Sequence, residues 1–270
     1  MVINNFTVQL ASALPGLEKI DTPKGRTLRG EISTDFGRLY AYIKILSIED
    51  IAKEAICAVL ARKLHMPVPQ PFYVGADPIN TGHIVGNVHH IAFALQEEQL
   101  PMLRIRDLGS IQKEILHWPE LYSCAVFDAW IANRDRLPHN LLYEGNNSFW
   151  MIDHEEALPG FVASNTSVGT QLIEIIKTNK SEHELYQIRE KLLLLAEQYE
   201  GIDWDDIKRL VRFSDLPGSE KYFDSYISRL RERSSNIKQI LTQELEIKQL
   251  SMNFKISKKN STDDKGNQRK

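Results

Sequence analysis

Along the first part of the chain, aliphatic residues alternate with polar or aromatic ones, and this pattern predicts β-strands. In residues 38–46 the aliphatic side chains occupy every second position, as in a half-buried strand, and Lys44 falls on the other face. A second strand is predicted at residues 27–33, between a turn at residues 22–26 and another at residues 35–37. The two strands are therefore expected to form a hairpin.

The pattern changes to helical spacing soon after the strand that is predicted to end at residue 46. A helix is predicted at residues 48–65, because Ser47 and Asp50 resemble a capping pair and Pro67 stops the run. Apolar residues surround this helix on all sides, so we expect it to be buried. After an extended connector, residues 83–96 predict one or two further strands.

Downstream of residue 110 the apolar residues recur every three or four positions, which predicts a mainly helical region. An irregular loop is predicted at residues 155–170. The fold class is therefore α+β, with a β-rich part at residues 1–96 and a larger helical part at residues 97–257. We expect the polar residues 258–270 to be disordered. The predicted helices span residues 111–117, 120–133, 171–177, 183–199, 204–213 and 220–250.

Two short apolar runs enclose a polar turn within residues 141–152. The turn, residues 144–148, is rich in Gly and Asn, which tolerate positive φ, so the segment predicts a β-hairpin. A hairpin brings its two ends together. Asn140 at the entrance and Asp153 at the exit are therefore expected to lie side by side.

An amide oxygen next to a carboxylate suits Mg²⁺, which completes its shell with water and phosphate oxygens. Asp135 precedes Asn140 by five positions, as the catalytic aspartate precedes the metal-binding asparagine in kinases. We therefore predict that Asp135 is the catalytic base and that Asn140 and Asp153 bind metal. The neighbouring Arg134 and Arg136 are expected to hold phosphate or to fix the loop. The alternative is a polar connection without chemistry, because Asn, Asp and Pro are common in turns.

Lys44 occupies the place of the strand lysine that contacts nucleotide phosphates in kinases. In the helix that follows, Glu54 shares its stripe with two small alanines, which leave room for a partner. The expected partner is Lys44. A solvated lysine and a glutamate on a wet helix face are the alternatives. In a kinase, backbone groups near Ala94 and Gln96 would bind adenine.

The run FDAWIANRDRLPHNLLY, followed by FWMIDHEEAL, resembles the catalytic core of the HipA-like kinases and, more distantly, that of the phosphatidylinositol 3- and 4-kinases. Leu137 stands where the HipA-like pattern usually has His, and His139 directly precedes the asparagine. Neither departure removes the base or a metal ligand. We therefore expect both to affect which substrate is phosphorylated, and not phosphoryl transfer itself. The resemblance extends weakly over residues 20–160. The matching residues are Asn133, Asp135, Arg136, Asn140, Ile152, Asp153 and His154.

The resemblance implies a two-lobed protein-kinase-like fold, ATP and Mg²⁺ as cofactors, and transfer of phosphate to a protein serine or threonine. It also implies a toxin–antitoxin setting, with an antitoxin or another regulatory protein as a partner. Two alternatives stay open: a kinase of the same fold for a small molecule or lipid head group, and a catalytically silent kinase-like scaffold. The complete set of polar groups argues against a scaffold, which has no physical need of all of them.

Composition and charge limit the partners and the cellular compartment that we expect for this protein. A formal net charge of −3 and a pI near 6.3 give no overall attraction to nucleic acid, so no direct nucleic-acid binding is expected. Cys57 and Cys124 both lie in apolar helical patterns, which argues against a disulfide framework. The sequence shows no apolar run long enough to span a bilayer. We therefore expect a soluble, cytoplasmic protein.

Overall fold

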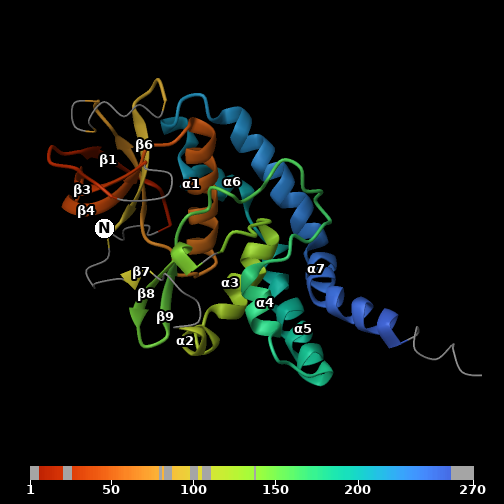
Figure 1. The fold of residues 1–270 in the computed structure, drawn as a ribbon. Helices are drawn as coiled ribbons and strands as arrows, with labels where there is room; N and C mark the ends of the chain where they lie inside the picture. Colours follow the sequence, from red (N-terminus) through yellow and green to blue (C-terminus); the bar gives the residue numbers. More distant parts are fainter. Residues whose placement is uncertain are drawn as a thin grey trace, which may run out of the picture.

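The computed structural model describes residues 6–20, 26–78, 81, 87–97, 103–104, 111–136 and 138–256. Within this part the molecule is a mixed α and β structure, with strands concentrated toward the N-terminus and helices after them (Figure 1). Nearly all of the predicted turn at residues 22–26, the predicted disordered tail at residues 258–270, and Leu137 lie outside the described residues.

The N-terminal strands close into a barrel. Their order is β1-β5-β6-β4-β3-β2, and β1 additionally pairs with β3, so that β1, β5, β6, β4 and β3 form a ring. The pairing of β1 with β5 is parallel, and the other pairings in the ring are antiparallel. Closure removes exposed strand edges. The strands are β1 (Gln9–Ala13), β2 (Glu18–Lys19), β3 (Thr27–Thr34), β4 (Gly37–Lys44), β5 (Pro71–Gly75) and β6 (Ile91–Gln96).

The predicted β3–β4 hairpin is confirmed, with Asp35 and Phe36 forming its turn. Gly30 in β3 lies against Leu17: a Cβ there would lie 2.5 Å from Leu17 Cδ2 and 3.2 Å from Leu17 Cα, so any side chain would require Leu17 to shift. Alternate barrel residues point inward and form a small separate core. This core consists of Ala13, Leu28, Ile32, Ala41, Ile43, Ile45, Phe72, Val74, Ala76, Ala92 and Ala94.

The predicted helices are present with bounds that differ by a few residues. The predicted hairpin is also confirmed as β8 (Leu141–Gly145) and β9 (Ser148–Met151), which form a small sheet with β7 (Leu103–Arg104). The helices are α1 (Ile48–Lys63), α2 (Gln112–Leu116), α3 (Leu121–Trp130), α4 (Gln171–Lys177), α5 (Glu182–Ala196), α6 (Trp204–Val211) and α7 (Glu220–Ile256), with short 3₁₀ turns η1 (Pro138–Asn140), η2 (Glu197–Tyr199) and η3 (Phe213–Asp215).

Helix α1 stands between the barrel and the C-terminal helices (Figure 1) and packs against β5 and β6 on one side and α6 and α7 on the other. Its N-terminus is capped by Ser47, whose side chain accepts a hydrogen bond from the Asp50 N–H at 3.2 Å. Tyr73 Oη donates to the Val211 carbonyl at 2.9 Å and ties β5 to the end of α6. One hydrophobic cluster therefore runs from Val8 to Leu245 through α1.

Two further sequence predictions concern cysteines and membranes. Cys57 and Cys124 are free and buried, as their apolar surroundings predicted. Across the part of the chain that the structure describes, no helix combines the length and the apolar character that crossing a bilayer requires.

Candidate active site

The loop after α3 carries Asp135 beside Asn140. Asn140 is buried, with 3% of its surface exposed, and Asp135 is partly buried. The Asn140 Nδ2 donates to the main-chain carbonyl of Asp135 at 2.6 Å and lies 3.5 Å from its Oδ2. Because the amide nitrogen is used in this way, the Oδ1 of Asn140 is the atom left for a cation.

The hairpin brings Asn140 to Asp153, as the apolar pattern predicted. Leu141 pairs with Met151, and the Ile152 N–H donates to the Asn140 carbonyl at 3.1 Å, so the two ends of the hairpin are joined at its base. Asp153 follows directly, with its backbone in the left-handed region at φ 62° and its side chain 31% exposed. A cation from solvent can therefore reach its carboxylate.

Lys44 at the end of β4 reaches the same place from the barrel. Its Nζ forms an ion pair with Glu54 of α1 and lies 3.2 Å from Asp153 Oδ1 and 3.5 Å from Glu155 Oε1. Burial lowers the pKa of the Lys44 ammonium, but Glu54, Asp153 and Glu155 outweigh burial and raise the pKa above its ordinary value. Lys44 is therefore charged at neutral pH.

Glu54 is fully buried, and both of its oxygens have partners. One pairs with Lys44, and the other accepts the His154 N–H at 3.1 Å and lies 3.4 Å from His154 Nδ1. Burial would raise the pKa of the Glu54 carboxyl, but Lys44 and His154 outweigh it and bring the pKa well below its usual range. The neighbouring Lys53 donates to the Glu155 carbonyl at 2.6 Å. Helix α1 thus holds both Lys44 and the segment that follows Asp153.

Glu54, Asp153 and Glu155 place carboxylate oxygens within 4.8 Å of one another. Glu54 is a poor metal ligand, because its oxygens already serve Lys44 and His154. Asp153 and Glu155 are partly exposed and supply the oxygen donors that Mg²⁺ prefers. Asn140 lies at the other end of the same hairpin, where its carbonyl accepts the Ile152 N–H. This donor set fits a divalent cation bound together with phosphate.

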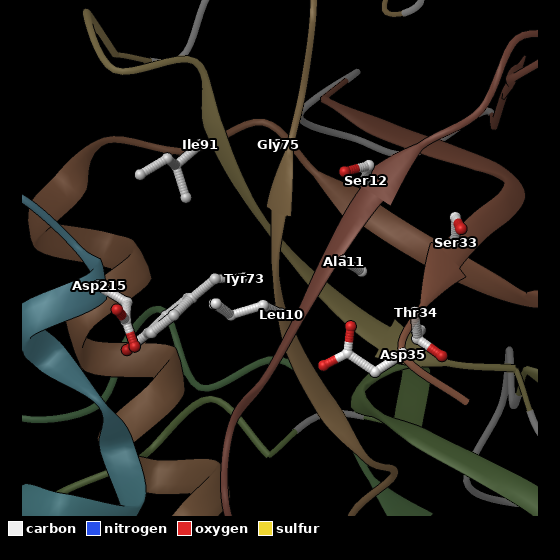
Figure 2. A pocket seen from close by; sticks show the side chains of 10 residues that line it. All are labelled: Leu10, Ala11, Ser12, Ser33, Thr34, Asp35, Tyr73, Gly75, Ile91 and Asp215. Carbon is white, nitrogen blue, oxygen red and sulfur yellow. The ribbon is translucent and has the colours of Figure 1, made fainter. Parts of the chain in front are cut away.

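A separate open pocket of about 470 Å³ lies on the side of β1, and Figure 2 shows Tyr73 and Asp215 on one side of it and Thr34 and Asp35 on the other. None of the predicted site residues lines it. It also has no Lys or Arg in its lining, so it offers no cation for a phosphate. The carboxylates beside Lys44, and not this pocket, form the candidate active site.

One model of a known protein family matches more than half of this chain. The model of a family described as HipA-like kinase matches residues 35–187, more than half of the chain and including Lys44, Glu54, Asp135, Asn140 and Asp153. The chain belongs to the HipA-like kinase family.

Other comparisons add less. A search of curated proteins finds no match for this HipA-like kinase. Among solved structures, it is similar to the crystal structure of a Helicobacter pylori proinflammatory kinase, CtkA, at 12% sequence identity and a TM-score of 0.49, covering 88% of this chain and 99% of that chain.

The segment near Ala94 and Gln96, predicted to bind adenine, lies in strand β6 of this HipA-like kinase. Ala94 is fully buried in β6, between Ile43 of β4 and Phe72 of β5, so its backbone groups belong to the sheet. The Gln96 N–H donates to the Gln70 carbonyl at 2.9 Å, so this donor is also used. Adenine binding by backbone groups of this segment stays a prediction, and the pairing of β6 with β5 was not foreseen from the sequence.

Several residues of the site were not singled out from the sequence. Glu155 was treated as the start of a loop, although it follows Asp153 by two positions and its acidic character was visible.

Arg136 was expected to hold phosphate or to fix the loop. It is buried and paired with Asp128, so the structure leaves it only the second role, whereas Arg134 is exposed. Asp128 gave no signal, because a lone acid in an apolar helix has no local pattern.

Proposed function

We propose that this HipA-like kinase uses Mg²⁺ and ATP to phosphorylate a serine or threonine of a protein. The observation that supports this most is the 3.2 Å contact between Lys44 Nζ and Asp153 Oδ1. It joins a barrel lysine suited to nucleotide phosphates to a hairpin aspartate suited to the metal. We assign the covering of the nucleotide to residues 1–96 and the base and metal ligands to residues 97–257, as two lobes.

Each side chain has a role in this proposal. Asp135 orients the acceptor hydroxyl and takes its proton as the oxygen attacks the γ-phosphorus and the bond to the β-phosphate oxygen breaks. Asn140, Asp153 and Glu155 would hold Mg²⁺, which neutralises charge on the phosphates. Lys44 exchanges its contact with Asp153 for phosphate oxygens, while Glu54 keeps its ammonium in place. A protein partner, including an antitoxin, stays a prediction.

The test is transfer from γ-labelled ATP to the protein itself or to proteins of a cell extract. Asp135→Ala is expected to lower turnover by roughly 10²–10⁴-fold and to leave nucleotide binding nearly intact, because the base does not hold the nucleotide. Asp153→Ala is expected to weaken binding of Mg²⁺ and ATP together. Asp224→Asn, on the exposed face of α7, is the control.

Other outcomes point elsewhere. Label found only in small molecules would replace the protein substrate with a small molecule or lipid. Nucleotide binding without any turnover would indicate a silent scaffold. Wild-type activity in both the Asp135 and Asp153 variants would overturn the assignment of the site.

A further inference from the structure

Beneath the loop that carries Asp135, Asp128 and Arg136 form an ion pair whose side chains have no solvent exposure. The Arg136 Nε and Nη2 donate to the Oδ2 and Oδ1 of Asp128 at 3.0 and 2.9 Å. This two-pronged contact fixes the plane of the guanidinium as well as its position.

The third nitrogen of Arg136 holds the base of the hairpin. Its Nη1 donates to the Ile152 carbonyl at 2.6 Å and to the Asn140 carbonyl at 3.3 Å. Ile152 is the residue directly before Asp153. One buried cation therefore binds the main chain of Asn140 and the peptide group that precedes Asp153.

Asp128 also fixes the backbone at Asp135 through Asn133. The Asn133 Nδ2 donates to Asp128 Oδ1 at 3.2 Å, and the Asn133 N–H donates to the Asp128 carbonyl at 2.8 Å. The Asn133 Oδ1 then accepts the Asp135 N–H at 3.1 Å. The Asp128 carboxylate thus fixes Asn133 before the candidate base Asp135 and Arg136 after it.

We propose that Asp128 and Arg136 are positioning residues that hold Asp135, Asn140 and Asp153 in the geometry for phosphoryl transfer without touching the substrate. The proposal rests on the proposed function. A buried ion pair contributes little net stability compared with apolar residues of the same size. Its presence under three functional side chains is explained by the fixed geometry that a guanidinium fork provides.

Arg136→Lys tests the proposal, because it keeps a positive charge beside Asp128 and removes the fork. We expect kcat to fall about 100-fold, as for a displacement of reacting groups by about 1 Å. The KM for ATP should rise by a smaller factor than kcat falls, because Lys44 still binds phosphate while the metal ligands shift. Arg233→Lys in α7 is the matched control, since Arg233 is equally buried and also binds main-chain carbonyls. It should keep kcat within about threefold at a similar loss of melting temperature.

Hydrogen exchange gives a readout that does not need activity. The amides of Asp135 and Ile152 should lose protection in Arg136→Lys and in Asp128→Asn, and keep it in Arg233→Lys. Unchanged exchange in both Arg136→Lys and Asp128→Asn would overturn the positioning role of the pair. A kcat loss no larger than in Arg233→Lys would do the same. A wild-type protein that transfers no phosphate would instead overturn the proposed function and, with it, the catalytic purpose of the pair.

Discussion

Lys44 and Glu54 depend on each other. A carboxylate without solvent exposure is strongly unfavourable unless a cation or hydrogen-bond donors compensate, and Glu54 has both in Lys44 and His154. The contact was predicted from the sequence, because kinases position a strand lysine with a glutamate of the following helix. Their roles toward nucleotide stay predictions.

The first prediction at this scale concerns stability. Lys44→Met leaves the Glu54 carboxylate buried without its cation, so the free energy of unfolding in urea should fall by about 3–5 kcal/mol. The double variant Lys44→Met with Glu54→Gln should recover much of this loss and still lack activity. Lys180→Met, which breaks an exposed pair on the helix surface, should cost less than about 0.5 kcal/mol. Wild-type stability of Lys44→Met would contradict the account.

A second residue-scale prediction concerns pH. The folded-state pKa of Glu54 is depressed, so the pair stabilises the fold above the unfolded-state pKa near ~4.3 and loses this contribution as pH falls below it. In that acidic window the slope from this one group approaches ~1.4 kcal/mol per pH unit. Glu54→Gln should therefore flatten the decline of unfolding free energy between roughly pH 5 and pH 3. Urea unfolding of wild type and Glu54→Gln at a series of pH values measures this decline. If the unfolding free energies of the two proteins fell in parallel with pH, the pKa of Glu54 would not be depressed.

Among the elements, the β8–β9 hairpin shows how local chemistry sets a functional distance. Asn146 and Asn147 have φ of 49° and 61°, as a two-residue turn with positive φ at both positions requires. The turn pairs Gly145 with Ser148, and beyond a register shift between Tyr143 and Gly145 the strands run on to the pair of Leu141 and Met151. The hairpin then closes with the Ile152 N–H on the Asn140 carbonyl. A residue at the tip therefore affects the ends of the hairpin.

The corresponding prediction is a substitution at the tip. Asn147→Val places a branched side chain in the left-handed region and should cost about 2 kcal/mol of unfolding free energy. It should also weaken Mg²⁺-dependent nucleotide binding, because the hairpin base loosens. Asn147→Gly, which accepts positive φ, is the control and should bind like wild type. Equal effects of valine and glycine would show that the turn conformation does not matter.

At the scale of the whole molecule, helix α7 fixes the irregular segment at residues 155–170. Arg229 donates to the carbonyls of Leu158, Pro159 and Val162 at 2.9, 2.5 and 3.1 Å. Near the other end of the segment, one carboxylate of α7, Glu244, accepts three successive backbone N–H groups, those of Val168, Gly169 and Thr170, at 2.9–3.1 Å. The segment that leaves the active site is thus held by side chains from a distant part of the chain.

Glu244→Ala tests this arrangement. Because three partly or fully buried donors lose their acceptor, the free energy of unfolding should fall by about 3 kcal/mol. Amides 168–170 should exchange faster with solvent. Glu232→Ala, on the exposed surface of α7, is the control and should change neither measurement. Unchanged exchange at residues 168–170 would show that Glu244 does not hold the segment.

The sequence by itself determined the features that neighbouring residues encode. The periodicity of residues 48–65, the turn at residues 144–148 and the spacing of Asp135, Asn140 and Asp153 are local patterns, and they predicted α1, the hairpin and the candidate site. Backbone conformation responds mainly to such neighbours, so these predictions needed no knowledge of the rest of the chain.

Only the tertiary structure decided which surfaces meet. The pairing of β6 with both β4 and β5 places Ala94 inside the sheet, and no local pattern indicates which strands pair. The grip of α7 on residues 155–170 likewise depends on long-range contacts. Asp128 and Arg136 are only eight positions apart, but their pairing follows from their common burial, which the sequence did not indicate. These contacts form only when the whole chain has folded and has buried particular charged and apolar side chains together. Local sequence patterns therefore do not predict them.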